Sequence, residues 1–208
     1  MNNLISFAFY LLVLLFSIII HEVAHGSVAL FFGDTTARDR GRLSLNPVKH
    51  FDVFGFVILP FVTYYILGFP LGSAKPVPIN SSNFRNKKWG EIAVSVAGSF
   101  TNLLLGIIFS LIVRFFPLPP NLSSAFSYIA FLNFILGVFN LIPIPPLDGS
   151  HLIFIFFPEN WTIIKIYLQQ LGLIILISLI YITHGRILDW VLILVQFIFK
   201  FFSGISFQ

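Results

Sequence analysis

The sequence predicts an all-α polytopic membrane protein. Of its 208 residues, 57% are hydrophobic and only 10% are charged, whereas average globular domains carry about 25% charged residues. The mean hydropathy is +0.95. Long apolar stretches recur along the chain, and a helix needs about 20 such residues to cross the hydrocarbon core. These observations together favour a bundle of membrane-spanning helices.

Six apolar stretches make up most of the chain. The second and fourth are short for a span, and the second contains Pro60. We expect the last two to form a C-terminal helical hairpin at about residues 163–203. The stretches are residues 4–32, 53–69, 92–116, 126–142, 163–183 and 187–202.

The loops on either side of the second stretch are both basic. Lys and Arg mark cytoplasmic loops, and one simple span cannot have both ends in the cytoplasm. We therefore expect Val53–Phe69 to be a non-crossing or re-entrant segment, which is tolerated where protein covers it. The prediction is about five transmembrane helices plus this segment. The basic residues are Arg38, Arg40, Arg42 and Lys49 before it, and Lys75, Arg85, Lys87 and Lys88 after it.

The stretch 35–45 is rich in Thr and alternates in polarity, so it admits short β-structure. Such a strand edge could hold an unwound peptide. The net charge is +4, and eight of the twelve basic residues cluster in the two loops. They are expected to orient the protein in the lipid bilayer rather than bind nucleic acid. The length predicts a single membrane-embedded domain over residues 1–208, without a PDZ or CBS module.

The motif His21-Glu22-Val23-Ala24-His25 interrupts the first apolar stretch. HExxH on a helix places two imidazoles on one face, where both can bind zinc, beside a carboxylate that can act as a base. Charged residues at membrane depth are costly, so a functional role is the default interpretation of Glu22. The chain has no cysteine, so only His, Asp or Glu can complete the site.

A third ligand is needed because catalytic zinc usually takes three protein ligands and keeps one open position. Asp148 is the main candidate, since it follows Pro143, Pro145 and Pro146 and precedes Gly149, where a helix must unwind. Asp148 could instead cap the following helix. His151 is then the substitute ligand.

Two further groups of polar residues have structural interpretations. His50 and Asp52 could form a second metal site, but a hydrogen-bonded turn that holds the non-crossing segment is favoured. A small, polar face on the third apolar stretch is typical of helices that approach closely. Its members are Gly98, Ser99, Thr101, Asn102 and Gly106.

With HExxH in the first span and Asn140 to Gly149 at the end of a later one, the chain resembles the site-2 protease family of intramembrane zinc metallopeptidases. It is most similar to the short bacterial branch that lacks PDZ and CBS domains. Ser44–Pro47 with His50 and Asp52, Leu59-Pro60, and Ala74–Asn80 support the resemblance. Ser99 departs from it, because the family commonly has proline after the glycine.

The resemblance implies that His21, His25 and Asp148 bind Zn²⁺, that Glu22 is catalytic, and that Asn140 helps to position the substrate. It also implies a metallopeptidase core at about residues 4–150 and transmembrane helices of other proteins as substrates. The expected location is the bacterial inner membrane, with the active site toward the cytoplasm. The alternative is a non-hydrolytic membrane metal transporter or metal-binding protein, in which Glu22→Gln would retain function.

Overall fold

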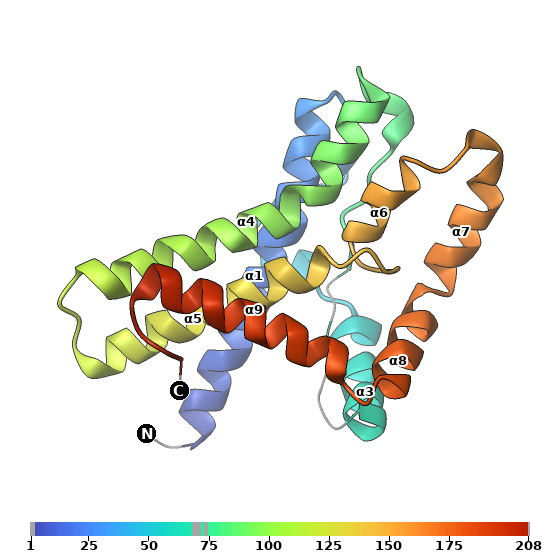
Figure 1. Ribbon diagram of the computed structural model, residues 1–208. Coiled ribbons are helices and arrows are strands. Elements are labelled where there is room, and N and C mark those ends of the chain that lie inside the picture. Colours follow the sequence, from blue (N-terminus) through green and yellow to red (C-terminus); the bar gives the residue numbers. More distant parts are fainter. Residues whose placement is uncertain (1–2, 68–71, 73–74, 208) are drawn as a thin grey trace.

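The computed structural model describes residues 3–67, 72 and 75–207, and these residues form helices, turns and extended segments without a strand. The all-α prediction is therefore confirmed. The three longest helices are α1 (Asn3–Phe31), α4 (Lys87–Phe115) and α5 (Pro120–Asn140). Helix α4 packs against both α1 and α5, and these three helices form the body of the molecule (Figure 1).

The shorter elements surround this body. Between α1 and α4 lie α2 (Thr36–Asp39), η1 (Pro47–Lys49), the π-helix η2 (Phe54–Ile58), α3 (Leu59–Leu67) and η3 (Ser81–Asn83). After α5 follow α6 (Gly149–Phe154), η4 (Glu159–Trp161), α7 (Thr162–Gln170), α8 (Gly172–Ile182) and α9 (Arg186–Ser203).

Three helices in the described part of the chain are long and apolar enough to span a membrane, namely Ile5–Phe31, Lys87–Phe115 and Pro120–Asn140. Helices α7 and α8 add a fourth if they form one span, broken by a bend of 60°. The bend lies beside Gly172, where a Cβ atom would come within 2.8 Å of the Pro146 nitrogen. Helix α9 has 18 residues but carries Arg186, Asp189 and Lys200, so the count of five spans is not confirmed.

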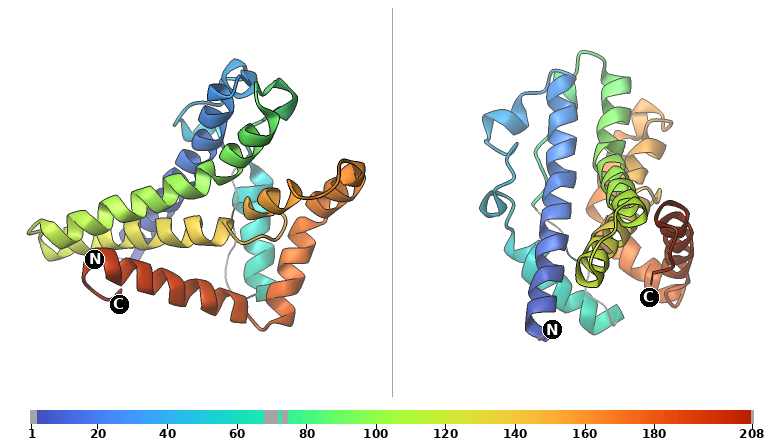
Figure 2. Two further views of the ribbon diagram at one scale, coloured as in Figure 1. Left: turned by 45° about the horizontal axis from the view of Figure 1, so that its top comes forward. Right: turned by 90° about the vertical axis from the view of Figure 1, so that its left-hand side faces the viewer.

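The C-terminal end of helix α1 lies beside the N-terminal end of helix α4, although 55 residues separate them in the sequence. The Arg85 N–H donates to the Phe32 carbonyl at 2.9 Å, and both ends lie together in Figures 1 and 2. The chain between them therefore starts and finishes on one side of the bundle, as a non-crossing segment must. Within it, η2 and α3 have five and nine residues, fewer than the about 20 that a span needs. The last residue of the predicted segment, Phe69, lies outside the described residues.

The expectation of short β-structure in residues 35–45 is wrong. This stretch forms helix α2 followed by turns. The Thr35 hydroxyl donates to Asp39 Oδ2 at 2.6 Å, and the Thr36 N–H donates to Asp34 Oδ1 at 3.1 Å. These local side-chain hydrogen bonds favour a turn and a helical start over an extended ladder. The stretch therefore offers no strand edge to a substrate.

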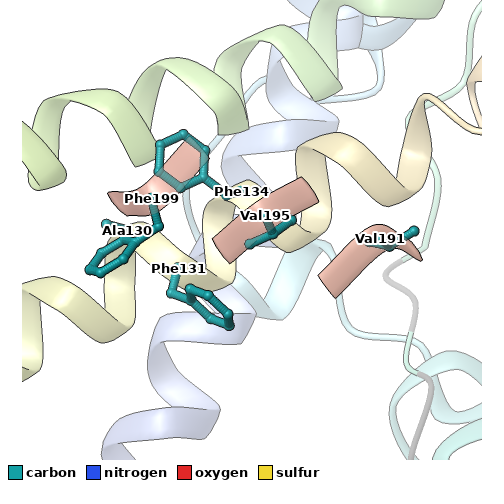
Figure 3. Packing of buried hydrophobic residues seen from close by; sticks show 6 residues of the cluster. All are labelled: Ala130, Phe131, Phe134, Val191, Val195 and Phe199. Atoms are coloured by element: carbon teal, nitrogen blue, oxygen red, sulfur yellow. The ribbon is translucent and has the colours of Figure 1, made fainter. Parts of the chain in front are cut away.

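The C-terminal helix α9 lies across α5 and α4. Figure 3 shows the cluster that joins α9 to α5, in which side chains from both helices interleave. The rings of Phe131 and Phe199 meet edge to face with centroids 5.8 Å apart. Phe134 is fully buried, and a Cβ atom at Gly106 of α4 would lie 2.7 Å from its ring. The cluster consists of Ala130, Phe131, Phe134, Val191, Val195 and Phe199.

Candidate metal centre

Two histidines on one face of α1 form the first part of the site. His21 and His25 are one helical turn apart, so their side chains point the same way. Both are buried, with 7% of each residue exposed. Their Nε2 atoms lie 3.0 Å apart. The HExxH pattern thus places its two imidazoles as the sequence predicts.

Asp148 reaches the same point from the far end of the chain. Its Oδ2 atom lies 3.0 Å from His21 Nε2 and 3.2 Å from His25 Nε2. Asp148 does occupy the N-cap position of α6, but its side chain makes no capping hydrogen bond. The carboxylate turns toward the histidines instead, which favours the ligand interpretation over the cap.

The proline-rich turn after α5 accounts for this placement. Pro143, Pro145 and Pro146 cannot continue a helix, so the chain leaves the α5 axis after Asn140. It folds back so closely that a Cβ atom at Gly149 would overlap the Leu141 carbonyl. Only glycine fits there, and the tight return directs the Asp148 side chain at α1.

His151 is not part of the candidate ligand group. Within the described residues, the groups of His, Cys, Asp and Glu that can hold a metal reduce to His21, His25 and Asp148, with all ligand atoms within 4.8 Å of one another. His151 lies three residues beyond Asp148, and its Nδ1 faces the Gln169 amide at 3.4 Å. The substitute ligand is therefore not needed to complete the triad.

The donor set fits a zinc ion. In a tetrahedral site with Zn–N and Zn–O bonds of 2.0–2.1 Å, two ligand atoms are about 3.3 Å apart. The three separations here are 3.0, 3.0 and 3.2 Å. His25 Nδ1 lies 2.6 Å from the Val94 carbonyl, which can only accept. The ring proton is therefore on Nδ1, and the Nε2 lone pair is available to a metal.

Helix α4 closes the site without giving a ligand. A Cβ atom at Gly98 would lie 2.5 Å from Nε2 of both His21 and His25. The sequence indicated Gly98 as a point of close helix approach, but not that the two candidate ligands His21 and His25 lie against it. The Val94 carbonyl was missed altogether, since a main-chain acceptor leaves no signal in the sequence.

Glu22 and Asn140 line the same cavity as the three candidate ligands. This cavity has a volume of about 1230 Å³ and is bounded by apolar side chains of α1, α5, α8 and α9. The Asn140 Nδ2 donates to the Leu136 carbonyl at 2.9 Å, which leaves its second amide hydrogen for another acceptor. The predicted catalytic and substrate-binding residues thus share one chamber with the metal centre.

His50 and Asp52 lie in hydrogen-bonded turns, and neither belongs to the group of described residues that could hold a metal ion. His50 is fully buried, with Nε2 at 2.7 Å from the Ser44 carbonyl. Asp52 accepts from the Gly55 N–H at 2.8 Å, at the start of η2. Both residues act in hydrogen-bonded turns before η2 and α3, as the favoured interpretation of the sequence has it.

Two buried histidines and an aspartate that meet inside a bundle of apolar helices define a membrane protein with a candidate metal centre. Comparison with known proteins names the family: the model of Peptidase family M50 matches residues 9–119 and 119–182. The chain belongs to this family, the site-2 protease family of intramembrane zinc metallopeptidases. The cofactor is zinc.

Three relatives illustrate the relationship. "Putative zinc metalloprotease YwhC" of Bacillus subtilis is 34% identical over 192 residues, which cover 88% of this chain and 84% of the relative. "Putative zinc metalloprotease Rip2" of Mycolicibacterium smegmatis is 32% identical, covering 92% and 73%. "Zinc metalloprotease MJ0392" of Methanocaldococcus jannaschii is 26% identical, covering 74% and 35%. No solved structure matches the chain.

Proposed function

We propose that His21, His25 and Asp148 are the zinc ligands of this protease, that Glu22 is its general base and acid, and that Asn140 positions the substrate. The observation that carries this proposal is the meeting of three ligand atoms from α1 and the start of α6 at 3.0–3.2 Å. The proposed domain is a single membrane-embedded unit over residues 1–208. Its catalytic core spans about residues 4–150, and a C-terminal helical hairpin follows at about residues 163–203.

The reaction is hydrolysis of a peptide bond in a membrane-embedded segment. Zinc, when bound, supplies the Lewis acidity that activates water and polarises the scissile carbonyl. Glu22 accepts a proton from the attacking water at a carboxylate oxygen. As the C–N bond breaks, Glu22 returns this proton to the leaving nitrogen. The second amide hydrogen of Asn140 is available to the substrate main chain, since the first is bonded to Leu136.

The apolar cavity suits a transmembrane segment of another protein. Its volume of about 1230 Å³ exceeds the usual 300–1,000 Å³ of small-ligand pockets. We therefore propose membrane proteins as substrates, in an unwound form, since a helix hides its carbonyl groups in its own hydrogen bonds.

The active site is proposed to face the cytoplasmic side of a bacterial inner membrane. His25 is six residues before the end of α1 at Phe31, a distance of about 9 Å along the helix axis. That end of α1 is joined to the start of α4, so the basic residues that directly follow α1 and directly precede α4 lie near it, namely Arg38, Arg85, Lys87 and Lys88. By the positive-inside rule this is the cytoplasmic end.

The decisive experiment compares bacterial membranes that carry the wild-type protein with membranes that carry Glu22→Gln. Proteomics of membrane fragments should find cleavage products only with the wild type, and purified Glu22→Gln should retain zinc. Asp189→Asn on the exposed start of α9 is the matched control and should cleave normally. If the two membranes yield identical fragments, or if metal-dependent function survives in Glu22→Gln, the non-hydrolytic alternative replaces the protease.

A further inference from the structure

An extended segment, Lys75–Asn80, runs along α1 beside Glu22. The main-chain N–H of Val77 donates to Glu22 Oε2 at 2.8 Å. Val77 is 6% exposed, and a Cβ atom on Gly26, one turn after Glu22, would lie 2.8 Å from Val77 Cγ1. The absence of a side chain at Gly26 therefore lets this segment approach within hydrogen-bonding distance of the proposed base.

Two prolines fix which residue makes this contact. Pro76 and Pro78 flank Val77, and proline has no N–H and a φ fixed near −65°. A shift of the segment by one residue would place a proline nitrogen, which cannot donate, opposite Glu22. Val77 therefore presents a single donor in a stiff, extended frame.

Both ends of the segment are held by hydrogen bonds from other parts of the chain. At the first end, the Lys75 N–H donates to the His50 carbonyl at 3.1 Å, and Arg42 Nη2 donates to the Lys75 carbonyl at 2.6 Å. At the second end, the Asn80 N–H donates to Asp34 Oδ2 at 2.7 Å. The segment is thus fixed on either side of the Glu22 contact.

The anchor at the second end, Asp34, is itself held firmly by its neighbours. Asp34 is 0% exposed, and its Oδ1 accepts hydrogen bonds from the Thr36 N–H, the Thr36 hydroxyl and Asn83 Nδ2. Burial raises the pKa of Asp34, but the hydrogen bonds from Asn80, Thr36 and Asn83 outweigh it and hold the pKa below its usual range. Burying a carboxylate costs free energy unless hydrogen bonds compensate for it, so breaking the hydrogen bonds to Asp34 would be strongly unfavourable.

We propose that Lys75–Asn80 is a positioning strap for the catalytic base. The Val77 N–H fixes one carboxylate oxygen of Glu22, so that the other is oriented for proton exchange, and Asp34 keeps the strap in place. Val77 and Asp34 are positioning residues that act through Glu22. This inference rests on the proposed role of Glu22.

The first test changes only the donor. Val77→Pro removes the N–H, so kcat should fall about 10- to 100-fold, the worth of one hydrogen bond to a charged group. KM and zinc content should stay unchanged, whereas a general loss of structure would alter both. Val77→Ala, which retains the N–H, is the comparison variant and should keep most of the wild-type kcat.

The second test needs no turnover. Hydrogen exchange of the 75–83 peptide, which has few amides because of its prolines, should become faster in Glu22→Ala and in Asp34→Asn. Asp34→Asn replaces an acceptor of the strap and should lower kcat in the same direction as Val77→Pro. In the double variant Val77→Pro/Asp34→Asn, kcat should fall by less than the product of the two single-variant decreases, because both substitutions act through one hydrogen bond.

Turnover is measured with a quenched fluorescent reporter. The reporter contains the cleavage site of the membrane protein whose fragment appears in wild-type membranes but not in Glu22→Gln membranes. If no such fragment exists, the proposed function itself fails. If the wild type cleaves it and Val77→Pro does so with unchanged kcat, only the strap is refuted. Should Val77→Pro not accumulate, unchanged kcat and exchange in Asp34→Asn refute the strap instead.

Discussion

Gly98→Ala is predicted to abolish the metal centre from a helix that holds none of its ligands. The added Cβ atom would lie 2.5 Å from His21 Nε2, His21 Cε1 and His25 Nε2. Ordinary contacts between such atoms are about 3.5 Å or longer, so the imidazoles must retreat by about 1 Å. Ligand positions in a metal site tolerate only about 0.2 Å. We therefore expect zinc content to fall well below one ion per chain and cleavage to fall at least 100-fold.

The assay is zinc content by mass spectrometry on detergent-purified protein, followed by cleavage of the reporter. Gly106→Ala is the matched control, because it lies on the same helix and its Cβ atom would meet the Phe134 ring at 2.7 Å. It should lose stability and keep its zinc. Alanine favours a helix over glycine by about 1 kcal/mol, so helix propensity cannot explain a loss in Gly98→Ala. Full zinc occupancy and normal cleavage in Gly98→Ala, or equal zinc loss in both variants, would refute the reasoning.

Three further predictions concern the ligands and the Asp34 anchor. Asp148→Ala should lose zinc and activity while His151→Ala keeps its zinc, and the reverse result would exchange their roles. Removal of zinc with a chelator should stop cleavage and lower the melting temperature, because the metal binds the folded state, and added zinc should restore both. Because the pKa of Asp34 is lowered by folding, its stabilising effect is full above its unfolded pKa of about 3.9. That effect disappears as the pH falls through the lower folded value, so the melting difference between wild type and Asp34→Asn should shrink there; a constant difference would contradict it.

The parts of the site that could be predicted are those set by local periodicity and by backbone chemistry. HExxH on a helix fixes the two imidazoles one turn apart whatever surrounds them. Three prolines before Asp148 ensure that the helix ends there. The contacts of Gly98 and Val94 with the histidines could not be predicted, because they depend on how α4 is placed along α1. No residue type in the sequence encodes this placement directly.

The fold shows the same division. Overall hydropathy gave the class correctly, because apolar helices are the main way to satisfy backbone groups in lipid. The alternating residues 35–45 favoured a strand, but Thr35, Thr36 and Asp34 form side-chain hydrogen bonds within a few residues of one another. The bend of 60° between α7 and α8 could not be predicted, because it lies where Gly172 meets the proline-rich turn, which is distant in sequence.

The contribution of α4 has a mechanical consequence. Two residues of α4 contact the histidines. The Val94 carbonyl accepts a hydrogen bond from His25 Nδ1, and Gly98, which has no side chain, leaves room for both imidazole rings. A slide of only one residue along the axis moves both by about 1.5 Å, which breaks the acceptor contact and brings larger neighbours against the imidazoles. The alignment of two neighbouring membrane helices therefore has to be kept to within a fraction of one residue. Substitutions far from the three proposed ligands that disturb this alignment should therefore abolish activity, although the ligand residues themselves are unchanged.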